Sequence, residues 1–420
     1  MPRRAERPGS PKKPEGTPSR ETNAPRGTLL FRLSDPRSLR VALRRLRRRA
    51  EKLKPPEESI AAFEAHRNAN LKALSHQVRA GSFRFTALRP VAIVKSPGKY
   101  RPILIPPVVD RVLQRALLTA IEPYVATKID FPTSHAFRAG KDFGVKSALA
   151  TLLRHIRGGK THVLIVDIKD FFPSVNATRL FNDLAALLPD RTVIPLLQQL
   201  QNWEINDLGR LPIHKRRCFP HPGTGLPQGS VLSPMLANFY VRALDEEATE
   251  ARLAIVRYAD DIAIAASSKE EAINAFGWLE DRLAALDLKV HPLGTDKSRI
   301  CTVARPGFDY LGLHILASGP RITVKPARKS IDNAKNTISE CLSPASPAPL
   351  AERYQALRYF VTGWFSAYSP LCDVSRSRAE ILEHCHNRLA GLLASYGLLP
   401  KSGALSKSQR RLLGVETLFA

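Results

Sequence analysis

Three acidic residues at the ends of apolar segments constrain the fold of this chain more than any other feature. Asp167 ends the run Val163-Leu164-Ile165-Val166, which predicts a buried strand with a carboxylate at the rim of a sheet. Asp260 and Asp261 lie between two short apolar segments, about 254–258 and 262–266, which predict a tight hairpin. Two adjacent carboxylates at such a turn repel each other, and a bound cation relieves that repulsion.

Either acidic feature alone has an ordinary explanation as a turn, a helix cap or a surface charge. If the two strands are neighbours, however, the three carboxylates converge and can hold two Mg²⁺ ions about 4 Å apart, with Mn²⁺ as an alternative ion. One ion activates an attacking hydroxyl and the other stabilises the leaving phosphate oxygens. The combination therefore predicts phosphoryl transfer.

The charge balance indicates a polyanionic partner. The chain has 64 Lys and Arg against 38 Asp and Glu, a formal net charge of +26. Such a surface favours nucleic acid or an anionic membrane. We find no apolar run long enough to span a bilayer, and the start Met1-Pro2-Arg3-Arg4 leads into polar sequence, so we expect nucleic acid and no membrane. Five scattered cysteines predict no disulfide framework and a cytoplasmic location.

The N-terminal part divides into a tail and a helical extension. Residues 1–28 are basic and poor in large apolar side chains, which predicts a disordered tail. We expect residues 29–90 to form helices, the first of which opens at Asp35 and the second of which covers about 57–79. The first helix carries an arginine face that includes Arg44 and Arg48. This face either contacts a nucleic-acid backbone or is merely solvated.

Strands and helices mix in the rest of the chain, which predicts the α+β class. Segments 91–96 and 100–105 predict a hairpin with a basic tip, and 201–221 predicts a loop or a short insertion. The chain after about residue 319 reads as mostly helical. The Pro/Ser-rich segment 343–349 looks like a linker, and we expect it to separate the catalytic sheet from the C-terminal helices.

A series of motifs in this sequence resembles those of reverse transcriptases, in particular the bacterial group II intron, retron and defence-associated lineages. The motifs occur in the family's order: Lys95-Ser96-Pro97-Gly98-Lys99-Tyr100-Arg101-Pro102, Ala136-Phe137-Arg138-Ala139-Gly140, Asp167-Ile168-Lys169-Asp170-Phe171-Phe172, Leu226-Pro227-Gln228-Gly229-Ser230-Val231-Leu232-Ser233-Pro234, Arg257-Tyr258-Ala259-Asp260-Asp261, Asp296-Lys297-Ser298 and Phe308-Asp309-Tyr310-Leu311-Gly312. The resemblance implies a right-hand polymerase fold, with fingers and an antiparallel palm sheet in 91–318 and a helical thumb in 319–420. It further implies an RNA template, a DNA or RNA primer, deoxynucleotide substrates and the cytoplasm of a bacterium.

The resemblance also implies roles for individual residues. Asp167 and Asp260 would bind both metal ions, Asp261 would assist, and the carbonyl of Ile168 would complete one coordination sphere. Phe172 lies five positions after Asp167, where the family places an aromatic gate that excludes a 2′-hydroxyl. The other implied contacts are to the incoming nucleotide (Lys95, Arg101, Gln228, Gly229), to the departing pyrophosphate as a general acid (Lys297) and to nucleic acid (Arg138, Tyr258, Phe308, Gly312).

Other interpretations stay open at this point. Without the surrounding motifs, Phe172 would be an ordinary core residue, and Lys95 and Arg101 would be surface cations. The fold could serve as an RNA-binding maturase, or as a defence enzyme, since little chain follows the thumb for a DNA-binding segment or a nuclease. An RNA-dependent RNA polymerase shares the two-metal chemistry. Two His/Cys clusters, at 214–221 and 384–386, lack the paired spacing of structural zinc sites.

Overall fold

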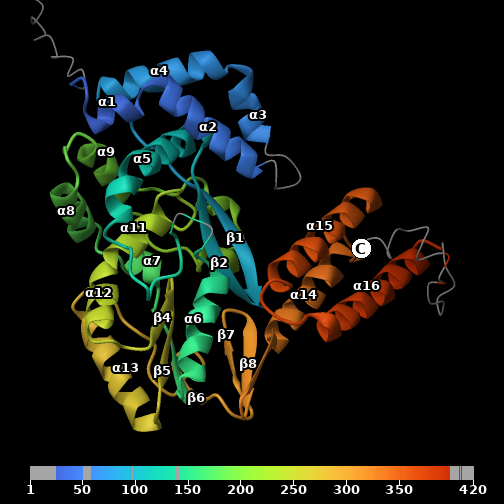
Figure 1. Cartoon of the computed structure of the whole chain (residues 1–420). Coiled ribbons are helices and arrows are strands. Elements are labelled where there is room, and N and C mark those ends of the chain that lie inside the picture. Colours follow the sequence, from blue (N-terminus) through green and yellow to red (C-terminus); the bar gives the residue numbers. More distant parts are fainter. Residues whose placement is uncertain are drawn as a thin grey trace, which may run out of the picture.

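The computed structural model describes residues 25–50, 58–96, 98–138, 140, 142–397, 406 and 408. Helices gather at one end of the molecule, a four-stranded sheet lies at the other, and a group of C-terminal helices stands to one side (Figure 1). Helices and antiparallel strands are both abundant, so the predicted α+β class is confirmed. The predicted disordered tail lies outside the described residues up to residue 24. Within the described ranges, no helix is both long and apolar enough to cross a bilayer.

The N-terminal end is a layer of helices whose apolar faces pack together: α1 (Leu29–Leu33), α2 (Pro36–Ala50), α3 (Glu58–Ala65), α4 (Arg67–Arg79) and α5 (Val108–Ala126). The carboxylate of Asp35 accepts a hydrogen bond of 2.7 Å from the amide of Arg37, as expected of a helix N-cap. The single helix predicted at 57–79 is wrong, because the backbone leaves the helical region at His66 and starts α4 anew.

An antiparallel hairpin, β1 (Arg89–Ser96) and β2 (Lys99–Ile105), leads from these helices toward the sheet, as predicted (Figure 1). The predicted insertion packs against the base of this hairpin, follows η1 (Gln199–Gln201), and contains η2 (Leu208–Arg210) and α10 (Ile213–Arg216). The amide of Leu88 donates to the carbonyl of Glu204 at 2.8 Å, and Trp203 is buried with Leu88 and Leu104. The insertion therefore packs against the base of the hairpin and supports it there.

The central sheet has the strand order β4-β5-β3-β6, and every neighbouring pair is antiparallel. Its strands are β3 (His162–Asp167), β4 (Ile255–Tyr258), β5 (Asp261–Ala266) and β6 (Arg299–Thr302). Alternate side chains of β3 enter different cores, with Leu164 on the face of α13 (Lys269–Ala284) and Val163 on the face of α6 (Val145–Arg157). The remaining helices of this part are α7 (Phe171–Ser174), α8 (Ala177–Leu187), α9 (Ile194–Gln198), α11 (Ser233–Tyr240) and α12 (Arg242–Glu250).

A second antiparallel sheet connects the first sheet to the C-terminal helices. It consists of β7 (Phe308–Tyr310), β8 (Leu313–Ser318) and β9 (Arg321–Pro326), and it is followed by α14 (Arg328–Cys341), α15 (Leu350–Tyr368) and α16 (Ser375–Ser395). The helical region thus starts after β9 and not near residue 319. The expected role of segment 343–349 is also wrong, because it joins α14 to α15 within one bundle that has a common core.

Candidate active site at the end of the four-stranded sheet

The three predicted carboxylates meet at one end of the sheet. Asp167 is the last residue of β3 and lies directly opposite Asp261, the first residue of β5. The tight turn between β4 and β5 places Ala259 at a φ of 59° and carries Asp260. The amide of Ile168 donates to the carbonyl of Asp260 at 3.2 Å. Strand register therefore brings together acidic residues that are far apart in the sequence.

The electrostatics of this cluster favour a cation. Burial raises the pKa of Asp261 to about 6, and the negative charges of Asp260 and Asp167 add to the shift. Burial, followed by the charge of Asp167, also raises the pKa of Asp260. The ammonium group of Lys297 contacts the carboxylate of Asp167, and His291 Nε2 lies 3.6 Å from the same oxygen, Oδ2. Positive charge near these carboxylates thus stabilises their ionised forms.

The donor set suits a hard divalent ion, because carboxylate oxygens are the ligands that Mg²⁺ prefers. In the described part of the chain, however, no three His, Cys, Asp or Glu side chains converge tightly enough to hold a metal. The carboxylate of Asp167 is instead directed at Lys297. The two His/Cys clusters, at 214–221 and 384–386, make contacts with backbone carbonyls. Cys218 donates to the Lys215 carbonyl, and His384 Nε2 lies 3.0 Å from the Lys335 carbonyl.

The acidic turn is held by Tyr310 and Arg257, two residues of the quoted motifs to which the sequence assigns no role. Tyr310 is buried, and its hydroxyl donates to the carbonyls of Val256 at 3.2 Å and Asp261 at 3.4 Å. Arg257 is fully buried, pairs with the carboxylate of Asp245, and donates to the carbonyl of Ala259 at 3.3 Å. The sequence signal for the contacts of Arg257 is the position of this charged residue inside the otherwise apolar strand Ile255–Tyr258.

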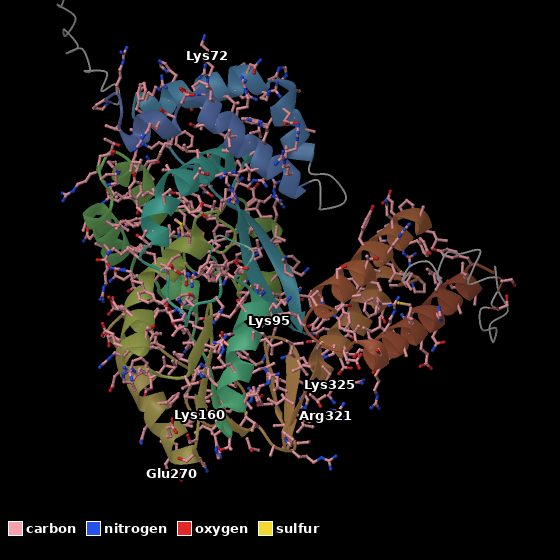
Figure 2. All side chains as sticks on the ribbon, viewed as in Figure 1. Lys72, Lys95, Lys160, Glu270, Arg321 and Lys325 are labelled. Atoms are coloured by element: carbon pink, nitrogen blue, oxygen red, sulfur yellow. The ribbon has the colours of Figure 1, made fainter. Side chains whose placement is uncertain are left out.

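The hairpin brings two of the predicted cations toward the carboxylates. Figure 2 shows Lys95 near the free end of the hairpin, away from the N-terminal helices. Partial desolvation lowers the pKa of Lys95, the positive charges of Lys297 and Arg101 lower it further, and Asp167 and Asp260 oppose them. Asp167 and Asp260 act on the pKa of Lys95, and Arg101 acts on the pKa of Asp260. Lys95 and Arg101 therefore lie within electrostatic range of the acidic cluster. The arrangement is one that would hold a polyanionic ligand between hairpin and sheet.

Phe172 and the segment around Gln228 lie side by side. The amide of Leu226 donates to the carbonyl of Phe172 at 2.8 Å, and a Cβ on Gly225 would come within 2.3 Å of that oxygen. The carbonyl of Gln228 accepts a hydrogen bond of 2.6 Å from the amide of Leu104 in β2. Gly229 has a φ of 127°, and a Cβ there would lie 2.3 Å from the Leu104 carbonyl, so only glycine fits.

The residues predicted to contact nucleic acid fall into different environments. Arg44 and Arg48 are exposed on α2, and Arg44 lines a pocket of about 360 Å³ with three further arginines (Arg40, Arg47, Arg67) and Glu64. Tyr258 is partly buried at the end of β4, opposite Asp261. Gly312 has a φ of 78° in the turn after β7, where a Cβ would lie 2.8 Å from the Tyr368 hydroxyl.

Two of these residues are engaged within the folded chain, and their contact with nucleic acid stays a prediction. Phe308 is 3% exposed and packs in a core that includes residues of both sheets. The side chain of Arg138 is 6% exposed, and its guanidinium donates to the carbonyls of Phe131 and Ser134 at 2.7 and 2.9 Å. Its cation also lies 3.7 Å from the centroid of the Phe143 ring. Arg138 also pairs with the carboxylate of Asp130 and therefore holds its own loop together, and its contact with a template stays a prediction.

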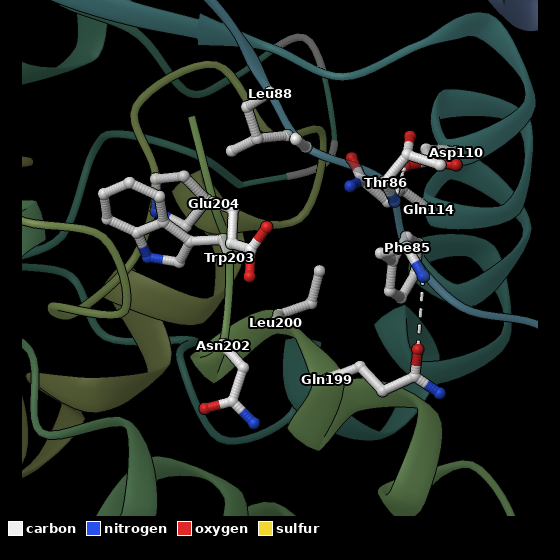
Figure 3. A pocket seen from close by; sticks show the side chains of 12 residues that line it. Phe85, Thr86, Leu88, Asp110, Gln114, Gln199, Leu200, Asn202, Trp203 and Glu204 are labelled. Atoms are coloured by element: carbon white, nitrogen blue, oxygen red, sulfur yellow. Dashed lines mark hydrogen bonds between the residues drawn. The ribbon is translucent and has the colours of Figure 1, made fainter. Parts of the chain in front are cut away.

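A cavity of about 160 Å³ lies at the base of the hairpin, and among its described lining residues Gln199 and Asp110 are already engaged, whereas Trp203 Nε1 is buried without a hydrogen-bond partner (Figure 3). Gln199 accepts a hydrogen bond of 3.2 Å from the Phe85 amide. The carboxylate of Asp110 accepts hydrogen bonds of 2.9 Å from both the amide and the hydroxyl of Thr86. Burial raises the pKa of Asp110, but its two bonds to Thr86 are those of a structural group. We therefore place the active site at the sheet and not in this cavity.

Comparison with known families identifies the class of protein that this fold and this acidic cluster define. The model of the family "Reverse transcriptase (RNA-dependent DNA polymerase)" matches residues 93–315, which is more than half of the chain. The chain therefore belongs to the reverse transcriptase family. The family assignment predicted from the motifs is confirmed, and with it the right-hand polymerase fold. Members of this family generally use divalent metal ions.

The chain is similar to several curated relatives. It is 30% identical over 189 residues to Protein YkfC of Escherichia coli, which covers 44% of this chain and 46% of the relative. It is 27% identical over 183 residues to the Group II intron-encoded protein LtrA of Lactococcus lactis, covering 42% and 28%. It is 32% identical over 131 residues to the Retron Ec73 reverse transcriptase of Escherichia coli, covering 30% and 38%. The match spans less than half the length of each of these relatives.

Proposed function

We propose that this chain is an RNA-directed DNA polymerase that adds deoxynucleotides to a DNA or RNA primer on an RNA template. The observation that carries the proposal is the pairing of Asp167 with Asp261, beside Asp260, at the end of an antiparallel sheet. Burial of neighbouring carboxylates disfavours their charged forms unless a cation binds, which is why the pKa values of the doublet are raised. Membership in the reverse transcriptase family supports the same activity.

In this proposal the hairpin belongs to the fingers, the four-stranded sheet is the palm, and α14–α16 form the thumb. The N-terminal helices α1–α4 are an extension that packs on α5. The pairing of β9 with β8 supports a palm that runs to Pro326, since the two strands share one sheet. The thumb then starts at Arg328 and has its own apolar core.

Asp167, Asp260 and Asp261 are the residues proposed to hold two Mg²⁺ ions, with the Ile168 carbonyl as a further ligand. When bound, the ions would lower the pKa of the primer hydroxyl and stabilise negative charge on the transferred phosphate. Tyr310 and Arg257 keep the turn that carries the doublet in place. Positioning of this kind accounts for much of the catalysis in phosphoryl transfer, because the reaction requires little covalent chemistry from the protein.

The residues around the acidic cluster take the remaining roles in this proposal. Lys95 and Arg101 neutralise the triphosphate of the incoming nucleotide, with Gln228 and Gly229 beside it. Phe172 excludes a 2′-hydroxyl and so selects deoxynucleotides. Lys297 exchanges its contact with Asp167 for one with the departing pyrophosphate and donates a proton there.

The decisive experiment is primer extension on an RNA template with Mg²⁺. Wild-type protein should extend the primer with deoxynucleotides, whereas Asp260→Ala and Asp261→Ala should lose extension while they keep template binding. Asp281→Ala is the matched control, because Asp281 is an exposed carboxylate on α13. Extension by ribonucleotides instead of deoxynucleotides would replace this proposal with an RNA polymerase. Extension that survives both catalytic substitutions would refute the assignment of the site.

The relatives support two biological settings, since they include an intron-encoded protein and a retron enzyme. We propose a bacterial enzyme of group II intron-like or antiviral-defence type, with nucleic acid as its partner. Sequencing the nucleic acid that copurifies with wild-type protein distinguishes these settings. A folded intron RNA would support a maturase role on the same fold, and a short noncoding template with its DNA copy would support the defence role.

A further inference from the structure

The segment 131–138 is a loop that the protein holds rigidly against the sheet. The amide of Arg257 donates to the carbonyl of Thr133 at 2.8 Å, and the amide of His135 donates back to the carbonyl of Arg257 at 2.9 Å. Thr133, Ser134, His135 and Ala136 are all at most 6% exposed. The loop therefore behaves as an added edge of the catalytic strand β4.

The two residues that flank Phe137 are fixed independently. The amide group of Asn238 donates to the Ala136 carbonyl at 3.2 Å, and Asn238 is itself fully buried. On the other side, the guanidinium of Arg138 is bound to two carbonyls of the loop. The backbone on both sides of Phe137 is thus determined by buried contacts.

Phe137 itself has two unfavourable features at once. Its φ is 57°, a left-handed conformation that side chains with a Cβ rarely adopt. Its large apolar side chain is 39% exposed, although every residue from Thr133 to Ala136 is buried. Backbone strain of this kind persists where the surrounding structure enforces it, and it is concentrated at functional sites.

The ring of Phe137 is directed at the proposed sugar gate. Its centroid lies 6.4 Å from that of Phe172, with an interplanar angle of 61°, which is an edge-to-face contact. Phe172 in turn lies 5.5 Å from Phe171, and Phe171 is 3% exposed in the core. The three rings form a row from the core to the surface, with Phe172 in the middle. Phe171 restricts the rotation of the Phe172 ring on the side of the core, and Phe137 restricts it on the side of the surface.

We propose that Phe137 is a positioning residue for sugar selection, which holds the Phe172 ring in place so that a ribonucleotide cannot push it aside. This inference rests on the proposed function, because it requires Phe172 to be the gate. A gate ring that packs on one side only could rotate away from a 2′-hydroxyl. A second ring, held on a loop that is anchored to the catalytic strand, removes that freedom.

The test is the ratio of kcat/KM for a deoxynucleotide to kcat/KM for the matching ribonucleotide, measured on one RNA template and primer. This ratio is independent of the fraction of active protein, so a purely structural role for Phe137 would leave it unchanged. We expect Phe137→Ala to lower the ratio by about three- to tenfold, the worth of one edge-to-face aromatic pair. Phe172→Ala should lower it at least as much. The double variant should resemble Phe172→Ala alone, because Phe137 acts through that ring.

Three further variants separate the loss of the Phe137 ring from effects on folding and from the loss of any exposed aromatic residue. Phe137→Gly removes the ring and also relieves the left-handed strain, so it should fold at least as well as Phe137→Ala and lose the same discrimination. Phe137→Tyr keeps the ring edge and should restore the ratio. Tyr396→Ala removes a 51% exposed aromatic at the end of α16 and should leave the ratio at the wild-type value.

The possible results separate the inference from the proposed function. If Phe172→Ala relaxes selection while Phe137→Ala and Phe137→Gly keep the wild-type ratio, the gate stands and the role of Phe137 is refuted. If neither position changes the ratio, Phe172 is not the gate, and the inference falls with it. Additive losses in the double variant would also overturn the proposal, because Phe137 would then act on the nucleotide independently of Phe172.

Discussion

Removal of one negative charge from the acidic cluster should stabilise the metal-free protein while it destroys activity. The pKa of Asp261 is raised from an ordinary 3.8 to about 6 by burial and by Asp260 and Asp167. A difference of roughly two units corresponds to at most about 3 kcal/mol of unfavourable free energy in the folded state at neutral pH. Because Asp261 is partly open to solvent, we expect Asp261→Asn to recover about 1–3 kcal/mol.

The sign of the pH dependence follows from the direction of the shift. Between pH 4 and pH 6 the folded protein binds more protons at Asp261 than the unfolded chain does, so the free energy of unfolding falls as pH rises. The unfavourable free energy of ionised Asp261 in the folded state is therefore complete above about pH 6 and absent below about pH 4. The advantage of Asp261→Asn over wild type should be largest at pH 7.5 and should disappear as the pH approaches 4.

The assay is urea unfolding in the presence of a chelator, followed by tryptophan fluorescence, since Trp278 on α13 packs against the main core. Asp281→Asn, on the exposed face of the same helix, is the control and should show no such pH dependence. Added Mg²⁺ should stabilise wild type by about 1.4 kcal/mol at ten times its dissociation constant, and the Asp261→Asn variant less. A variant that is less stable than wild type at pH 7.5, or whose gain is independent of pH, would refute the reasoning.

Further substitutions test the surroundings of the site. Gly312→Ala should destabilise the protein by about 1–3 kcal/mol in thermal unfolding, because of the positive φ and the contact with the Tyr368 hydroxyl. Adding Tyr368→Phe should recover part of the loss, and no recovery would exclude the clash. Tyr310→Phe should lower stability by about 1 kcal/mol and reduce kcat, since the acidic turn loses a buried hydrogen bond; unchanged kcat would exclude a positioning role. Replacing Arg44 and Arg48 by Gln should reduce the salt slope of template binding by roughly 1.5, and an unchanged slope would mean that the arginine face is only solvated.

Local patterns in the sequence predicted the elements near the site well, because periodicity and turn residues act over short distances. The hairpin at 91–105 was recognisable from two apolar runs around a Pro-Gly turn. β3 and β5 were recognisable from apolar runs that end or begin at a carboxylate. By contrast, the helix break at His66 and the strand β9 had no comparable local signal, and both were missed.

Contacts made in the folded chain decide how exposed two of the predicted site residues are. β7 contains only three residues, and such a short strand does not reveal from the sequence that the side chain of Phe308 is buried. Arg138 was expected at the template because it is a cation in a polymerase motif. Its partners in the folded chain are the carboxylate of Asp130 and two backbone carbonyls of its own loop, and the sequence alone does not show that these contacts form.

The sequence by itself determined which acidic residues end buried strands, which segments are helices or strands, and which family the motifs belong to. Only the tertiary structure decided that Asp167 pairs with Asp261, that Lys297, 130 residues away, contacts Asp167, and that the ring of Phe137 meets that of Phe172. The physical reason is that periodicity selects the buried face of each element locally. Register and ring contacts depend instead on the simultaneous packing of elements that are distant along the chain.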